Sequence, residues 1–376
     1  MRRVYLDHHA ATPLLPAARD AMLRAHELGW ANASSAHHEG RAARAMLEDA
    51  RRAVAGALGA SAADIVLTGG GTEAGNLGVL GLAGEQVEDL VVITSSIEHP
   101  AVERATNELA RRGATVHALD LHGSLAPLRD LVARPIFSTA RCLLAVQAVS
   151  HETGSTIDVV SIASMLPKGA SVFVDASAAL GKLSADRFVR HDWAVAIAGA
   201  KIGASAGAGA LLVPRSIDVT PRQLGGAHER GRRAGTPDVA AHTALGLACR
   251  ALGTRLQQMP RIAVQRDRLE AALVALGGVV NGAETERVAT VTNVSFHGWR
   301  KSTLVAALDL EGIAVSAGAA CSSGLDGPSP VVRALHPDEP WRSESCVRFS
   351  LGIETSDEDI DLAVAAITRV LARRAG

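Results

Sequence analysis

The chain has 376 residues, of which 48% are hydrophobic, and its formal net charge is −1. This length permits a large core and two domains, and the balanced charge argues against a nucleic acid bound through a basic face. Four cysteines in so long a chain do not make a disulfide framework, and the N-terminal segment lacks the apolar stretch of a signal peptide, so we expect a reducing, cytoplasmic setting.

Apolar runs alternate with helical patterns over the first two thirds of the chain, which predicts a mostly parallel sheet. We expect strands at 4–6, 65–68, 90–95, 115–118, 142–146, 172–175 and within 193–213, and helices at 14–27, 39–58, 102–112 and 158–166. The run 193–213 is not expected to span a membrane, because Lys201 at its centre costs about 2.5–3.5 kcal/mol in a bilayer.

The last third of the chain predicts a smaller domain. Long helices are expected at 239–252 and 262–276, and the second of them is followed by a strand at 288–296, a helix from 302, a strand at 314–316 and a helix at 356–374. The domain boundary is expected between the first two of these helices.

Three glycines, Gly69 to Gly71, separate the strand 65–68 from a following helix. Backbone N–H groups in such a segment can turn toward an anion, the helix N-terminus adds partial positive charge, and Thr72 adds a hydroxyl donor. A flexible turn explains the same glycines, so the glycines alone leave both interpretations open. The Walker pattern is excluded, because no Lys-Ser/Thr pair follows.

His99 ends a strand directly before Pro100, a residue that favours a helix start. A histidine in this position has a structural role or, beside a cofactor ring, stacks on the ring and moves protons.

Asp175 and Lys201 lie near the ends of two apolar, β-rich runs, where open α/β sheets build their sites. One explanation is a salt bridge. The other is a pyridoxal phosphate site, in which the lysine forms a Schiff base with the cofactor aldehyde and the carboxylate pairs with the pyridinium nitrogen. The small residues around Lys201 would let a flat ligand approach the backbone.

Three later features carry possible chemistry. The segment 223–237 is charged, Gly-rich and longer than an ordinary connection, which is typical of functional or interface loops. Cys321 lies among small residues in 317–327, which indicates a mobile, exposed thiol that is either a nucleophile or a harmless free cysteine, whereas the cysteines at 142, 249 and 346 are expected to be buried. Arg348 interrupts a strand and needs an anionic partner, either a protein carboxylate or the carboxylate of an amino-acid substrate.

Together and in this order, these segments resemble the cysteine desulfurases, fold-type I pyridoxal phosphate enzymes, in the group with the longer cysteine loop. The resemblance covers essentially the whole chain and rests on YLDHHAATP, NASSAHHEGR, TGGGTEAGN, IEHPAV, HETG, VDAS, the lysine turn, GGAHERGRRAGT, SAGAACSSG and VRFSLG. It implies an α/β fold with a large domain, residues 15–258, built on a mostly parallel seven-stranded sheet. Residues 1–14 and 259–376 would form a smaller α+β domain.

The resemblance also implies the roles of the cofactor residues. Lys201 would carry pyridoxal 5'-phosphate and move protons, Asp175 would pair with the ring nitrogen, and His99 would stack on the ring. Gly71 and Thr72 would bind the phosphate. Thr236 would bind the phosphate of the other subunit, which requires a homodimer.

The implied reaction converts L-cysteine to L-alanine. Cys321 would attack the substrate sulfur and keep it as a persulfide for a sulfur-acceptor protein. Arg348 would hold the substrate carboxylate, and Asn32 would be a further substrate contact. The resemblance implies no metal, nucleic acid or membrane partner.

The chain departs from the family pattern at the cofactor. Ser-x-His-Lys is replaced by Ala198-Gly199-Ala200-Lys201, which removes two phosphate donors, and Ala178 replaces a glutamine that donates to the ring hydroxyl. Asn-Asn-Glu becomes Ser-His-Glu, and we expect His151 to take over the contact to the ring oxygen. Each lost hydrogen bond to a charged group costs about 1.5–3 kcal/mol, so we expect weaker cofactor binding than in a typical member.

Two alternatives follow from these losses. One is a related β-elimination enzyme, such as a selenocysteine lyase or a cysteine or cystine lyase. The other is a degenerate homologue with weak cofactor binding that acts as a binding subunit.

Overall fold

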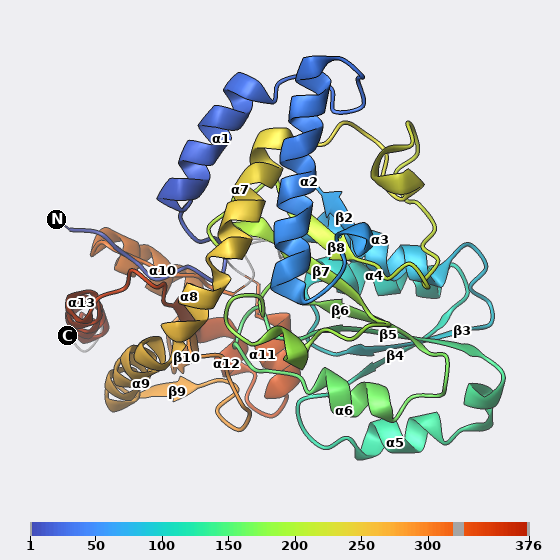
Figure 1. Ribbon diagram of the computed structural model, residues 1–376. Coiled ribbons are helices and arrows are strands. Elements are labelled where there is room, and N and C mark those ends of the chain that lie inside the picture. Colours follow the sequence, from blue (N-terminus) through green and yellow to red (C-terminus); the bar gives the residue numbers. More distant parts are fainter. Residues whose placement is uncertain (1, 319–326, 374–376) are drawn as a thin grey trace. The chain divides into compact units, whose positions relative to one another are not determined.

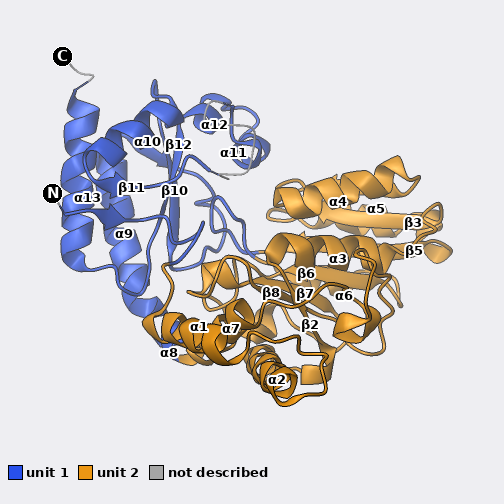
Figure 2. Ribbon diagram, turned by 90° about the horizontal axis from the view of Figure 1, so that it is seen from above, with its two compact units in different colours: residues 1–12, 149–156, 254–376 blue, residues 13–148, 157–253 orange. Residues whose placement is uncertain are grey.

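The computed structural model describes residues 2–318 and 327–373, which fall into two compact units (Figure 2). The large unit contains residues 13–148 and 157–253, and the small unit contains residues 1–12, 149–156 and 254–376. The sequence predicted boundaries after residues 14 and 258. It did not predict that the segment 149–156, which interrupts the large unit in sequence, belongs to the small unit.

A seven-stranded sheet forms the centre of the large unit, in the order β2-β8-β7-β6-β5-β3-β4 (Figure 1). Strands β7, β6, β5, β3 and β4 are parallel, and β8 is antiparallel to both of its neighbours. Because β8 reverses the direction between β7 and β2, every strand except β8 ends at the same edge. The strands are β2 Ile65–Thr68, β3 Leu90–Ser95, β4 Thr115–Leu119, β5 Arg141–Gln147, β6 Ser171–Asp175, β7 Ala194–Ala198 and β8 Gly209–Leu212.

Except for the edge strand β4, these segments are apolar and buried on both faces of the sheet. β3 and β8 are buried throughout, and β5 is buried except at its first residue. Continuous apolar runs of this kind are typical of sheets covered by helices. The mostly parallel seven-stranded sheet expected from the resemblance is confirmed.

Helices pack around this sheet. One apolar cluster joins Leu77 and Val102, from two of these helices, to Phe173 and Leu211 of the sheet. The helices of the large unit are α1 Pro16–Leu28, α2 His38–Leu58, α3 Gly71–Ala83, α4 Pro100–Arg111, α5 Ala126–Val132, α6 Val159–Ser164 and α7 Val239–Arg250, and α8 Leu252–Gln257 follows at its end.

The small unit contains a three-stranded antiparallel sheet, β12-β10-β9, and a parallel pair, β1-β11. Its core joins apolar side chains of α9, α10 and α13 to those of β10 and β12. The elements are β1 Val4–Tyr5, α9 Met259–Ala275, β9 Gly278–Val280, β10 Val291–Phe296, α10 Lys301–Leu310, β11 Ile313–Ala314, α11 Pro330–Leu335, α12 Trp341–Ser345, β12 Cys346–Ser350 and α13 Asp357–Ala372.

The apolar run 193–213 is not a single element. It forms β7, a 3-10 turn at Gly199–Lys201 and β8. Within residues 2–318 and 327–373, no helix combines the length and the apolar character that crossing a membrane requires.

Candidate cofactor and substrate site

Asp175 is the last residue of β6 and is buried at the carboxyl edge of the sheet, with 7% of its surface exposed. Its Oδ1 accepts a hydrogen bond of 2.9 Å from the backbone N–H of Ser177. This bond fixes the orientation of the carboxylate, and a negative charge at the centre of the edge suits a protonated ring nitrogen.

Lys201 lies in the 3-10 turn that follows β7, the strand beside β6. The turn is closed by the N–H of Gly199, which donates to the carbonyl oxygen of Ala208 at 2.9 Å. A Cβ atom on Gly199 would lie 2.8 Å from that same oxygen, so the turn needs glycine there. The tight turn therefore holds the half-buried Lys201 just beyond the strand end.

His99 is the N-cap residue of α4 and ends the short turn that follows β3. Its Nδ1 accepts the N–H of Ala101 at 3.1 Å, so the proton of the neutral ring lies on Nε2. Burial lowers the pKa of His99, the negative Asp175 opposes this shift, and the positive Lys201 adds to it. The three predicted residues are therefore close enough to interact, and the imidazole is neutral at pH 7.

Gly71 begins α3 at the same edge of the sheet. A Cβ atom on Gly71 would lie 2.8 Å from Ser177 Oγ and 2.9 Å from the Cβ of Ala198. The first turn of α3, which also carries the exposed Thr72, is thus packed against the ends of β6 and β7. The sequence predicted Gly71 and Thr72 as phosphate ligands, and a helix N-terminus at this position is suited to that task.

The long loop 223–237 is anchored to the large unit by buried charges. Glu229 accepts hydrogen bonds from both Nη atoms of Arg51, at 2.6 and 2.8 Å, and from the N–H of Leu67 at 2.8 Å. Glu229 and Arg230 have positive φ angles of 49° and 58°, a strained backbone that these contacts hold in place. Thr236 follows in this loop and is exposed.

Asn32 is exposed, and its Oδ1 accepts the N–H of Ser34 at 2.9 Å within its own turn. Its predicted contact with substrate stays a prediction.

Glu98 is a buried carboxyl beside this group that the sequence analysis did not single out. The hydroxyl of Ser95 donates to its Oε1 at 2.6 Å, and its Oε2 has no hydrogen-bond partner within residues 2–318 and 327–373. Burial raises the pKa of Glu98 to about 8; the negative charge of Asp175 adds to the shift, and the Ser95 hydrogen bond opposes it. At neutral pH this carboxyl is therefore largely protonated.

Replacing Glu98 by glutamine should change how stability depends on pH. The native carboxyl keeps its proton up to about pH 8, whereas the unfolded chain releases it near pH 4.5. The native state then binds more protons within that window, so this group makes the free energy of unfolding fall as pH rises through it. We expect the Glu98→Gln variant to lose this fall and to gain about 2–4 kcal/mol relative to the parent between pH 5 and pH 8.

The measurement is denaturant unfolding of both proteins at several pH values. Parallel stability curves across the window would contradict the burial of an uncharged Glu98.

Arg348 lies in β12 of the small unit with 3% of its surface exposed. Its Nη2 binds Asp7 Oδ1 at 2.6 Å, and its Nη1 donates to the carbonyl oxygen of His151 at 2.6 Å. The sequence left a protein carboxylate and a substrate carboxylate open as partners, and in this structure the partner is Asp7. The buried Nε of Arg348 has no hydrogen-bond partner in the described part of the chain, so this donor of the guanidinium has no acceptor there.

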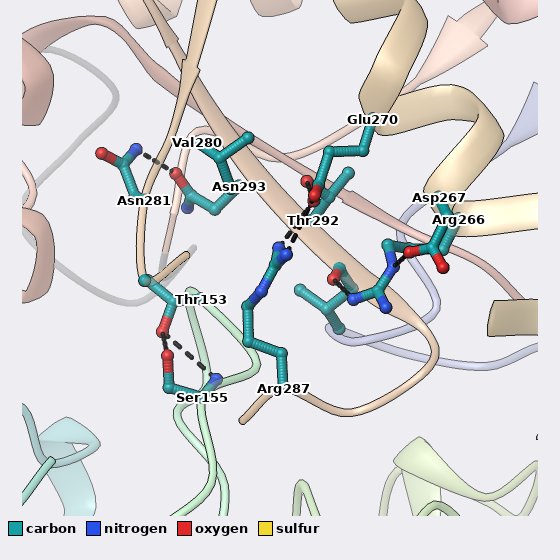
Figure 3. A network of polar contacts seen from close by, with 12 residues as sticks. Thr153, Ser155, Arg266, Asp267, Glu270, Val280, Asn281, Arg287, Thr292 and Asn293 are labelled. Carbon is teal, nitrogen blue, oxygen red and sulfur yellow. Dashed lines mark hydrogen bonds and ion pairs between the residues drawn. The ribbon is translucent and has the colours of Figure 1, made fainter. Parts of the chain in front are cut away.

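The segment 149–156 belongs to the small unit, and Figure 3 shows Thr153 and Ser155 of this segment together with Arg287 and Glu270. Ser155 pairs with Arg287 in a β-bridge, and Arg287 forms two hydrogen bonds with Glu270, at 2.6 and 2.9 Å. The carbonyl oxygen of Glu152 accepts from Asn293 of β10 at 3.2 Å. These contacts hold the buried His151, whose predicted contact with a cofactor oxygen stays a prediction.

Three of the four cysteines are free and buried. Burial raises the pKa of Cys142 to about 11, and it is also the main reason that the pKa values of Cys249 and Cys346 rise to about 12. All three are neutral thiols at pH 7 and are poor nucleophiles. Cys321 lies outside the described residues.

The residues at the sheet edge fit pyridoxal phosphate. An acid for the ring nitrogen, an amine for the aldehyde and a neutral imidazole interact with one another. Beside them lie the N-terminus of α3 and the hydroxyl of Ser177, which no residue of the described chain engages, and both can bind an anion. Lys201 would hold the cofactor, Asp175 would keep its ring nitrogen protonated, and the bound cofactor would supply an electron sink.

Comparison with known proteins agrees with this geometry. The family model described as aminotransferase class-V matches residues 4–363. The chain belongs to the class-V aminotransferase family. The family and its cysteine desulfurases use pyridoxal phosphate as cofactor.

Similar proteins of known family align with nearly the whole chain. A cysteine desulfurase of Bradyrhizobium diazoefficiens is 36% identical over 98% of this chain and 95% of that protein. An IscS-like cysteine desulfurase of Mycobacterium tuberculosis is 34% identical over 98% of this chain and 96% of its own length. A solved structure titled NifS-like protein superposes with a TM-score of 0.88 at 26% identity, covering 99% of this chain and all of that one. The resemblance to cysteine desulfurases seen in the motifs is thus confirmed for this class-V aminotransferase.

Proposed function

We propose that this class-V aminotransferase is a cysteine desulfurase that converts L-cysteine to L-alanine. The observation that carries the proposal is the group of Lys201, Asp175 and neutral His99 at one edge of the sheet. Lys201 holds the cofactor and moves protons, Asp175 stabilises the charge on the ring nitrogen, and His99 stacks on the ring. His99 Nε2 carries a proton that the ring can exchange with substrate.

Substrate recognition and sulfur acceptance belong to the same proposal. Arg348 holds the substrate carboxylate, for which its unpartnered Nε supplies a donor, and Asn32 and His151 are further contacts. The Cys321 thiol attacks the substrate sulfur; the carbon–sulfur bond breaks, alanine leaves, and Cys321 carries the persulfide. The three buried thiols support this assignment, because they leave Cys321 as the cysteine suited to react.

The assembly in this proposal is a homodimer. Thr236 lies exposed on a loop that two ion pairs hold, the buried pair of Arg51 with Glu229 and the half-buried pair of Arg233 with Glu73. From there it donates to the phosphate of the other subunit. A sulfur-acceptor protein and a reducing, cytoplasmic setting complete the proposal.

The test is to incubate the cofactor-loaded protein with L-cysteine and to quantify alanine and sulfide in the presence of a thiol reductant. We expect equal amounts of both products from cysteine and no product from cysteamine, which lacks the carboxylate that Arg348 binds. Parallel reactions with selenocysteine and cystine distinguish a lyase. Turnover of only selenocysteine or only cystine would show that the protein is a lyase and would overturn the proposal. Failure to bind pyridoxal phosphate would favour a degenerate homologue that acts as a binding subunit.

A further inference from the structure

Ser177 has a buried hydroxyl that no described residue engages. The residue is 7% exposed, and its Oγ has no hydrogen-bond partner among the residues that the structure describes. Alanine residues precede and follow it, so nothing in the local sequence calls for a hydroxyl. A buried hydroxyl without a partner destabilises a fold, and its presence here points to a ligand.

The position of this hydroxyl indicates what the ligand is. Ser177 Oγ lies 2.8 Å from the point where Gly71 would carry a Cβ atom, at the first residue of α3. α3 is 13 residues long, and no side chain caps its N-terminus among the described residues. Its first N–H groups and their partial positive charge therefore lie beside a free hydroxyl donor, a combination that suits a phosphate.

The neighbouring residue Ala198 also indicates that this location binds a phosphate. Its Cβ lies 2.9 Å from the same point at Gly71. The family pattern described above has a serine at the position of Ala198, and that serine donates to the cofactor phosphate. Ser177, in the turn after β6, and Ala198, the last residue of β7, thus lie close to the same point at Gly71, and their strands are neighbours in the sheet.

We propose that Ser177 donates a hydrogen bond to the phosphate of pyridoxal phosphate and so replaces the donor that Ala198 lacks. This inference rests on the proposed function, because it requires the cofactor at Lys201. Ser177 then has two roles. Its N–H orients Asp175, and its hydroxyl binds the phosphate. The weaker cofactor binding expected from the missing donors is offset in part.

The experiment compares the Ser177→Ala variant with the parent as cofactor-free proteins, each titrated with pyridoxal phosphate and with pyridoxal, which has no phosphate. The alanine keeps the backbone N–H that orients Asp175. We expect Kd for pyridoxal phosphate to rise about 10–100-fold, the value for one hydrogen bond to a charged group. We expect Kd for pyridoxal to change less than about twofold, and the thermal midpoint of the cofactor-free protein to stay the same or to rise.

A rescue and a control complete the design. In the Ser177→Ala background, Ala198→Ser should restore tight binding of pyridoxal phosphate and should return the ³¹P resonance of the bound phosphate toward that of the parent. Thr290→Val removes another buried, partnerless hydroxyl, in the small unit, and should leave both Kd values unchanged.

The outcomes separate the two proposals. If the parent binds neither compound, the proposed function fails. If the parent binds pyridoxal phosphate but Ser177→Ala leaves its Kd unchanged, or weakens both ligands equally, Ser177 is not a phosphate donor and only this inference is overturned.

Discussion

The Lys201→Ala variant is expected to lose covalent retention of pyridoxal phosphate and to convert cysteine at least about 10²–10⁴-fold more slowly than the parent. The side chain has two tasks in the proposed reaction, to hold the cofactor and to move a proton, and proton transfer alone contributes a factor of this size. The 3-10 turn supports this expectation, because it places residue 201 beyond β7, beside the strand that ends in Asp175.

The measurement begins with reduction of the loaded parent by borohydride, followed by digestion and mass spectrometry. The cofactor should appear on the peptide that contains Lys201 and on no other. Lys168→Ala is the matched control, because Lys168 is exposed in the same unit, and it should retain both cofactor and turnover. A cofactor found on another lysine, or normal turnover by Lys201→Ala, would refute the assignment of the sheet-edge site.

The Cys321→Ala variant is expected to keep its cofactor and to lose transfer of sulfur to an acceptor protein by more than about 10²-fold. Alanine cannot accept the substrate sulfur, and the other three thiols cannot replace Cys321. They are buried, with pKa values of about 11 or 12, so the fraction of reactive thiolate at pH 7 is about 10⁻⁴ or smaller.

Mapping the persulfide on the parent provides a direct check. After a single turnover with cysteine, the additional sulfur should be on the peptide that contains Cys321, and the peptides of Cys142, Cys249 and Cys346 should remain unmodified. Cys142→Ala is the control and should transfer sulfur normally. Full transfer by Cys321→Ala, or a persulfide on one of the buried cysteines, would remove Cys321 from the mechanism.

Three side-chain donors of the family pattern are missing around the cofactor, and the structure offers a replacement for one of them. The side chains of Ala198, Ala200 and Ala178 carry no hydrogen-bonding groups, so in the proposed site the ring hydroxyl and part of the phosphate would lack contacts that the family pattern provides. The hydroxyl of Ser177, in the turn after β6, lies where one of these contacts can be replaced. In this proposal the phosphate donor comes from Ser177, in the turn after β6, and not from residue 198 at the end of the adjacent strand β7.

The amino-acid pattern by itself determined most of the sheet, and it also supplied the residues proposed to bind the cofactor. Strands such as β3 and β5 are apolar on both faces, so each is visible locally as an uninterrupted run. Asp175, Lys201 and His99 each end or directly follow such a run, and parallel strands bring their carboxyl ends to one edge. Short elements without such a signal, among them β9 and α11, were missed, because a few residues carry too little periodicity to be distinguished from loops.

Only the tertiary structure decided which distant groups meet. Asp7 became the partner of Arg348 across 341 positions of sequence, the segment 149–156 joined the small unit, and Glu98 became a neutral acid. Ser177 was found without a partner for its hydroxyl. Each of these facts depends on burial and on neighbours supplied by other elements, and a sequence pattern, which reports local periodicity, contains neither.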